Sequence, residues 1–178
     1  GTDLVHFTDT DGDGKADKKE YILSGFDDHD THHAISGFCA DPSGAIYMGE
    51  GVFLHSNVET PYGPVRGTHG GFYRFNPIKG KLERTAQYNI PNPWGIAFDR
   101  WGQNFFIHTS GTKFSWMQQT AVKSRYNVNV TAPDLIKSNR VRPTSGLEFV
   151  SSSHFPDEVQ GDVILCNSIG YKGAKQHQ

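Results

Sequence analysis

The segment SGFCADPSGAIYMGEG at residues 36–51 decides the fold, because it describes two short strands joined by a tight turn. Its Asp-Pro-Ser-Gly sequence at 41–44 has the residue preferences of a type I turn. Two later segments repeat the pattern, WGIAFDRWGQNFFIHTSG at 94–111 and, with a longer turn, SGLEFVSSSHFPDEVQGDVILCNSIG at 145–170. The repeats begin at Gly37, Gly95 and Gly146, and are therefore spaced by roughly 50 to 60 residues.

A repeat of this length that is built from short strands is typical of β-propeller blades. The segment GGFYRFNPIKGKLERTAQY at 70–88 predicts a further hairpin, which completes a four-stranded first blade. We therefore expect an all-β fold in which residues 1–178 cover about three blades of a β-propeller. The expected parts are an outer hairpin at 1–26, blades at 35–88 and 93–142, and an incomplete blade at 145–178.

A closed propeller needs about four to eight blades. We therefore expect the remaining blades to come from the same polypeptide or from another chain. A free-standing sandwich of similar strands is the alternative. The composition agrees with a turn-rich protein, since the 178 residues include 20 Gly and 9 Pro. The net charge of −2 and the absence of basic runs exclude a nucleic-acid partner, and no stretch of about 20 apolar residues predicts a transmembrane segment.

The segment DTDGDGKADKKE at 9–20 matches the 12-residue calcium loop of EF-hands at every ligand position. Strand-like sequences flank it instead of helices, so calcium is expected to join two strands and not to open a groove between helices. A solvated acidic turn without a metal is the alternative. The predicted ligands are five carboxylates and one backbone carbonyl: Asp9, Asp11, Asp13, Lys15, Asp17 and Glu20.

Two loops that should meet at one face of the propeller carry most of the candidate chemistry, DDHDTHHAI at 27–35 and EGVFLHSNVETPYGPVRGTHGG at 50–71. Histidine titrates near neutral pH and arginine can stabilise an anion, so these loops suit acid–base catalysis. They would equally suit a transition metal. The alternative is a structural role, in which the loop histidines form hydrogen bonds to backbone carbonyl groups. The catalytic candidates are His32, His33 and Arg66; the cofactor-binding candidates are His55, His69, Trp94 and Arg142.

Trp94 and Arg142 stand at the equivalent entry points of the second and third repeats. Trp94 is expected either to line the floor of a pocket or to pack in the core. Arg142 is expected either to bind an anionic group or to pair with an acidic neighbour.

Four segments together carry a resemblance to a known family. They are TDGDGKADKKEYILSGF at 10–26, DTHHAISGFCADPSGAIYMGEGVFLHSNVETPYGPVR at 30–66, GGFYRFNPIKGKLE at 70–83 and NPWGIAFDRWGQNFF at 92–106. They resemble the planctomycete-type (PVC-type) membrane-bound dehydrogenases, which are similar to soluble quinoprotein glucose and sorbosone dehydrogenases. The resemblance implies a six-bladed propeller at a periplasmic, secreted or cell-surface location.

In the soluble quinoprotein enzymes a histidine acts as base beside pyrroloquinoline quinone, with arginine and calcium nearby. The resemblance implies that His32 or His33, together with Arg66 or Arg142, takes these parts. It also implies a cytochrome c domain or protein as the electron acceptor, although the chain itself has no C-x-x-C-H haem motif.

The sequence thus leads to two functional hypotheses. The first is a calcium-stabilised segment of an extracytoplasmic quinoprotein-like dehydrogenase that oxidises a sugar or an alcohol. The second is a non-catalytic propeller that serves as a binding or assembly module and holds a structural calcium ion.

Overall fold

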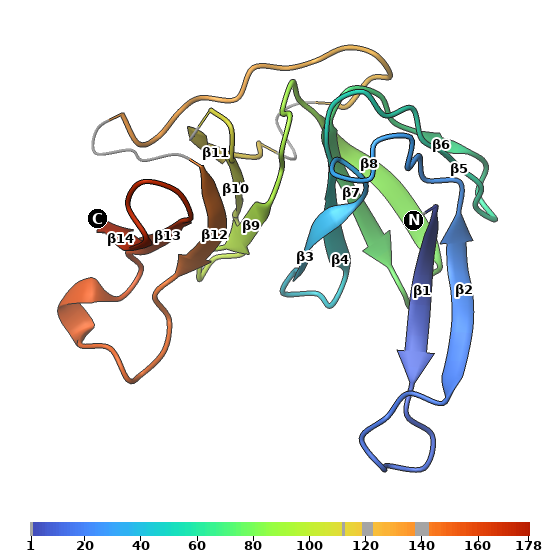
Figure 1. The fold of residues 1–178 in the computed structure, drawn as a ribbon, viewed down its shortest axis with the longest axis horizontal. Coiled ribbons are helices and arrows are strands. Elements are labelled where there is room, and N and C mark those ends of the chain that lie inside the picture. The colour runs from blue at the N-terminus through green and yellow to red at the C-terminus, as the bar shows by residue number, and fades with distance from the viewer. Residues whose placement is uncertain (1, 112, 119–122, 138–142) are drawn as a thin grey trace.

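The computed structural model describes residues 2–111, 113–118, 123–137 and 143–178, and it is an all-β structure (Figure 1). A short 3₁₀ turn at Asp157–Val159 is the one helical element among the described residues. No helix in this described part is long and apolar enough to span a membrane, which agrees with the prediction from the sequence. Arg142, which the sequence predicts as a binding residue, lies outside the described residues.

The first sheet has four antiparallel strands in the order β3-β4-β7-β8. They are β3 (Ser36–Ala40), β4 (Ile46–Glu50), β7 (Gly71–Asn76) and β8 (Lys81–Gln87). The turn between β3 and β4 forms as predicted, because the Asp41 carboxylate accepts bonds from the amides of Ser43 (2.8 Å) and Ala45 (3.0 Å). The strands expected for the first repeat are therefore confirmed.

The second and third sheets repeat this hairpin arrangement with three strands each. The second sheet has the order β11-β10-β9, and the third has the order β12-β13-β14. Their strands are β9 (Gly95–Phe98), β10 (Asn104–His108), β11 (Lys113–Trp116), β12 (Thr144–Phe149), β13 (Val163–Asn167) and β14 (Gly173–His177).

The first strands of successive sheets lie next to one another, since β9 contacts both β3 and β12 (Figure 1). Glycine permits this close approach. A Cβ atom on Gly95 would lie 2.9 Å from Cβ of Leu147 in β12, and one on Gly37, whose φ is +61°, would lie 2.8 Å from the carbonyl oxygen of Pro93. Two of the three glycines that mark the repeat in the sequence, Gly37 and Gly95, therefore lie where neighbouring sheets pack. The sheets described here do not close into a ring.

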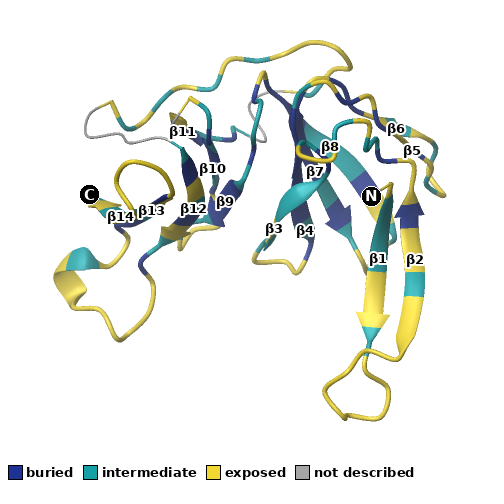
Figure 2. Ribbon diagram, in the orientation of Figure 1, coloured by how far each residue is buried: buried dark blue, intermediate teal, exposed yellow. Residues whose placement is uncertain are grey.

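Two hairpins flank the first sheet. The strands β1 (Asp3–Thr8) and β2 (Lys18–Ser24) carry the acidic loop at their tip, as the sequence predicts. The strands β5 (Asn57–Val58) and β6 (Val65–Arg66) belong to the long connection between β4 and β7. The hairpin β1–β2 is exposed toward its tip (Figure 2). Leu23, at its other end, is buried against the first sheet.

The core consists of three clusters that lie between these layers. The largest joins the first two sheets through Phe72, Tyr88 and Phe106, and a second packs the β1–β2 end on Met48 and Tyr73. The third joins the second and third sheets: Ala97, Ile107, Phe114, Leu147, Val163 and Leu165. Each sheet is therefore anchored to the next by apolar side chains.

One charged group is fully buried inside the first sheet. The carboxylate of Glu50, at the end of β4, lies 3.3 Å from a guanidinium nitrogen of Arg84 and accepts a bond from the Tyr73 hydroxyl at 3.2 Å. The Ser56 hydroxyl donates to the same carboxylate. Because a buried charge is stable only when it is paired, these partners must be in place for β4 to pack.

We therefore expect Glu50→Leu to lower the free energy of unfolding by about 3–5 kcal/mol, because the Arg84 charge would stay buried without its partner. Urea unfolding followed by circular dichroism measures this loss. Glu83→Gln is the matched control, since the partly exposed Glu83, on the same strand as Arg84, pairs with Lys81 on β8 and with Arg74 on β7 and should change stability by about 1 kcal/mol or less. A loss in Glu50→Leu no larger than in the control would contradict the role of the buried pair.

Candidate functional site

The first two sheets present strand ends at a common edge, which we call the entry end and which comprises residues 27–36, 50–71, 89–95 and 108–111. Backbone hydrogen bonds join these segments. The amide of Gly51 donates to the carbonyl of His33 (2.8 Å), and the amide of Thr109 donates to that of Asn92 (3.1 Å). Side chains from both predicted loops and from the second repeat therefore meet here.

His32 and His33 lie in a tight turn before β3. The His33 amide donates to the Asp30 carbonyl (3.0 Å), and the His32 amide donates to the Asp30 carboxylate (3.1 Å). In addition, Nδ1 of His33 lies 2.9 Å from Oδ2 of Asp30, a close approach that departs from ideal hydrogen-bond direction. The contact with His33 lowers the pKa of the Asp30 carboxyl, which therefore stays ionised beside the imidazole.

Aromatic rings surround these two histidines. The His32 ring meets the His33 ring edge-to-face at 5.0 Å and the Trp94 ring at 4.9 Å, while His33 meets Phe53 at 5.6 Å. The His33 side chain is 12% exposed and lies over Gly51, where a Cβ atom would come within 2.7 Å of the ring. The structure thus brings His32, His33 and Trp94 together, with His32 on the exposed side.

His55 and His69 form a second pair, with ring centroids 4.8 Å apart. Nδ1 of His55 is 2.9 Å from the Thr68 hydroxyl, and its backbone amide donates to the Asp27 carboxylate at 2.7 Å. His69 adopts a left-handed conformation with φ of 55°. The two histidines therefore sit on a constrained part of the 50–71 connection.

The residues around the buried Glu50 carboxylate hold the 50–71 connection through hydrogen bonds to backbone groups. Arg84 donates to the carbonyl of Gly70 (2.7 Å), and the Gln87 amide donates to the carbonyl of Thr68. The Ser56 hydroxyl that contacts Glu50 also accepts a bond from the amide of Asp27 at 2.8 Å. A hydrogen-bonded path thus links the interior of the first sheet to the loops that carry the histidines.

Sequence reasoning missed these supporting residues, of which Asp27, Asp30 and Glu50 are the charged acceptors. The available signals were a glutamate at the end of the apolar strand IYMGE and the acidic residues that precede the histidines in DDHDTHH. Burial of Glu50 and the partner of each aspartate follow from tertiary contacts, which residue type alone does not specify.

Arg66 stands apart from His32 and His33. It lies exposed on β6, where its guanidinium donates to the Asn57 side chain at 2.9 Å across the β5–β6 hairpin. The structure shows two histidine pairs, and Arg66 lies on the β5–β6 hairpin of the same connection that carries His55 and His69. Its bond to a neighbouring asparagine is a local cross-strand contact that the loop sequence does not reveal.

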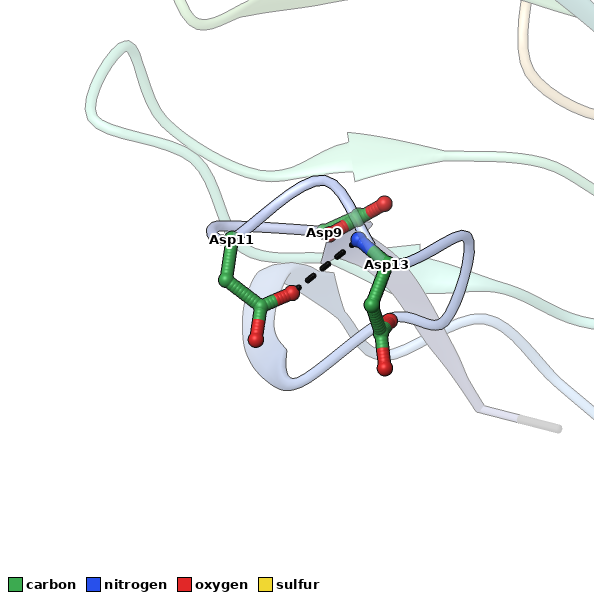
Figure 3. Close-up of side chains that lie close together, drawn as sticks. All are labelled: Asp9, Asp11 and Asp13. Atoms are coloured by element: carbon green, nitrogen blue, oxygen red, sulfur yellow. Dashed lines mark hydrogen bonds between the residues drawn. The ribbon is translucent and has the colours of Figure 1, made fainter.

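The acidic loop at the β1–β2 tip gathers three of the six predicted ligands. Carboxylate oxygens of Asp9, Asp11 and Asp13 lie within 4.8 Å of one another, and Figure 3 shows these side chains around the turn. The amides of Gly12 (2.7 Å) and Gly14 (2.9 Å) donate to Asp9 and lower its pKa. All three carboxylates are exposed, so the loop is open to an ion from solvent.

The other predicted ligands have different partners in this structure. Asp17 accepts a bond from the Thr10 hydroxyl at 2.6 Å, and Glu20 lies on β2, 3.0 Å from the Lys18 ammonium. The amide of Lys15 donates to Asp13 at 2.8 Å, a bond that does not involve the predicted ligand of this residue, its backbone carbonyl. Full coordination as in the EF-hand template would therefore require Asp17 and Glu20 to exchange these contacts for the ion.

Comparison with known proteins places the chain in a family. The model described as "Domain of unknown function (DUF7133)" matches residues 1–158, so the chain belongs to this family. No curated protein matches it. An X-ray structure named as a gluconolactonase is similar over 90% of this chain at 14% identity, with a TM-score of 0.54. The chain spans about half of that structure, 49% of its length, and the likeness concerns the fold.

The contact between His33 and Asp30 gives a direct test of the entry-end geometry. We expect His33→Gln to raise the pKa of Asp30 toward its ordinary value, because the main cause of its lowering is removed. Carbon-detected NMR titration of the aspartate carboxyls measures this change. His154→Gln, at an exposed loop histidine outside the entry end, is the matched control. An unchanged Asp30 pKa in His33→Gln would show that the two groups do not interact.

Proposed function

We propose that this chain forms three blades of a six-bladed β-propeller. The three successive antiparallel sheets, with first strands side by side, have the arrangement of neighbouring blades. The chain also spans about half of the structure to which it is similar, 49% of its length, so three such sheets correspond to about half of a complete ring. The remaining blades would come from the same or another polypeptide.

We further propose that the entry end of this propeller binds and converts a sugar or an alcohol, with His33 as general base. The observation that carries this proposal is the 2.9 Å approach of His33 Nδ1 to Asp30, beside His32 and Trp94. A carboxylate at Nδ1 favours the tautomer that holds its proton there, and this leaves Nε2 to accept a proton from a hydroxyl group. The Trp94 ring offers an apolar surface for the C–H face of a sugar.

Two reactions use such a base. In oxidation, the base takes the hydroxyl proton while hydride leaves the same carbon for an acceptor, and the sequence resemblance to quinoprotein dehydrogenases favours this reaction. In lactone hydrolysis, the base takes a proton from the attacking water, and the structural likeness to a protein named as a gluconolactonase supports this second candidate. If the reaction is oxidation, we also propose an extracytoplasmic location and a cytochrome c domain or protein as the electron acceptor.

The described entry-end residues do not fit pyrroloquinoline quinone, which carries three carboxylates. Asp30 places a carboxylate against His33, the Asp27 carboxylate accepts a bond from the amide of His55, and Arg66 is bonded to Asn57 on the β5–β6 hairpin. Repulsion between these aspartate carboxylates and the carboxylates of the quinone would disfavour binding of the quinone. The proposal for His33 therefore does not depend on this cofactor.

The decisive experiment uses the full polypeptide that contains this chain. Dye-linked oxidation of aldoses and alcohols, with and without added quinone, is measured beside hydrolysis of gluconolactone. We expect His33→Gln to reduce kcat by roughly 100-fold or more, since a general base contributes about 10²–10⁴. Asp28→Asn, which removes a neighbouring carboxylate, is the control and should keep full activity. Turnover in His33→Gln equal to that of the control would refute the base, and absence of both reactions would favour the non-catalytic binding module.

We also propose that calcium binds the acidic loop and stabilises the β1–β2 hairpin. Three exposed carboxylates within 4.8 Å repel one another, and a hard cation would remove that repulsion. Calcium at about 100 times its Kd would add about 2.7 kcal/mol to stability. We therefore expect a chelator to lower Tm by several degrees in the native protein and by less in an Asp11→Asn/Asp13→Asn variant.

Asp157→Asn is a suitable control for calcium binding, because it removes an exposed carboxylate far along the chain from the acidic loop. It should respond to the chelator like the native protein. A Tm that does not change on chelation, together with a loss of activity, would contradict a purely structural role for calcium.

A further inference from the structure

A separate cavity of about 180 Å³ lies between the first and second sheets, outside the histidine pairs at the entry end. Tyr88 and Ile90 contribute from the segment after β8, and Phe106 and His108 contribute from β10. Val130 closes one side through a backbone bridge to Tyr88. The remaining lining residues are Asn89, Lys113, Ser115, Thr131 and Ala132.

One half of this cavity is apolar and rigid. Tyr88 and Phe106 are buried and stack with ring centroids 5.0 Å apart. The Tyr88 hydroxyl donates to the carbonyl of Met117, so its polar atom is already satisfied and the ring serves as an apolar wall. Ile90, Val130 and Ala132 extend this wall. The surface therefore suits a small hydrocarbon or aromatic group.

The other half carries hydrogen-bond donors and one positive charge. His108 and Lys113 are direct partners across β10 and β11, as are Phe106 and Ser115, so these four side chains share one face of the sheet. Among the residues that the structure describes, no carboxylate pairs with the Lys113 ammonium. The Lys113 side chain is exposed, and its ammonium would attract an anionic group that enters the cavity.

The histidine at this position supports the same ligand chemistry. Burial, and secondarily the nearby Lys113 charge, lowers the pKa of His108, so the imidazole is neutral at neutral pH. The Gly111 amide approaches its Nδ1 at 3.4 Å, which leaves the proton on Nε2 as a donor. His108 thus adds a neutral donor beside a cation, together with the hydroxyls of Ser115 and Thr131.

We propose that this cavity binds a small organic monocarboxylate, with its carboxylate on Lys113 and its apolar body against the wall that Tyr88 and Phe106 form. The size agrees, because a cavity of about 150 Å³ accommodates a molecule as large as benzene. A short branched or an aromatic acid matches the division of the walls into apolar and donor halves. The site is distinct from His32 and His33 and does not depend on their chemistry.

The proposal is tested by isothermal titration calorimetry and NMR with isobutyrate, benzoate and the neutral isobutyramide as probes. We expect both acids to bind, and the amide to bind at least tenfold more weakly because it lacks the charge. Lys113→Gln should raise the Kd for the acids at least tenfold. Lys79→Gln removes an equal charge at an exposed turn outside the cavity and should leave the Kd unchanged.

A second variant tests the apolar half. Ala132→Leu should fill the cavity and abolish binding while Tm stays near that of the native protein. If this variant does not fold, the comparison of Lys113→Gln with Lys79→Gln still decides the question. Absence of saturable binding of both acids, equal affinity for acid and amide, or equal Kd values in the two lysine variants would each overturn the proposal and indicate a cavity that holds water.

Discussion

The buried carboxylate of Glu50 is the interaction on which the entry end depends. It takes partners from three places in the sequence, Arg84 on β8, Tyr73 on β7 and Ser56 in the long connection. Because an unpaired charge in this position would be costly, the sheet and the connection must assemble together. Gly67 leaves the space that this requires, since a Cβ there would lie 2.2 Å from the Tyr73 hydroxyl.

Hydrogen bonds connect the residues around Glu50 to the surface loops that carry the histidines. Arg84 and Gln87 hold the backbone beside His69, and Ser56 holds Asp27, which in turn binds the amide of His55. The carbonyl of His33 accepts a hydrogen bond from the backbone amide of Gly51, which belongs to the same connection. The loops that carry the histidines are therefore mounted on a packed sheet. Such support is what a site needs if its side chains are to keep a fixed geometry.

The segment between β8 and β9 connects two distinct features of the molecule. Its first residues, Tyr88 and Ile90, line the cavity between the sheets, and its last, Trp94, meets His32 at the entry end. Pro93 packs against Gly37 and Gly49 in the first sheet, so the segment also determines how closely β9 approaches β3. A sugar site and a carboxylate site would thus share one connection while using different chemical groups.

The sequence by itself determined the strands, because alternation, turn residues and repeated glycines act over a few neighbours: the turn at Asp41, the hairpin at 70–88 and the strands around the acidic loop all follow from local pattern. It also indicated that His32 and His33 stand before an inner strand. Only the tertiary structure decided which side chains meet. Asp30 orients toward His33, Arg66 bonds Asn57 across the β5–β6 hairpin, and Glu50 is buried with Arg84. The Glu50–Arg84 pair joins residues that packing brings together, whereas the other two pairs depend on the exact geometry of a turn and of a hairpin, for which residue type alone leaves many partners equally acceptable.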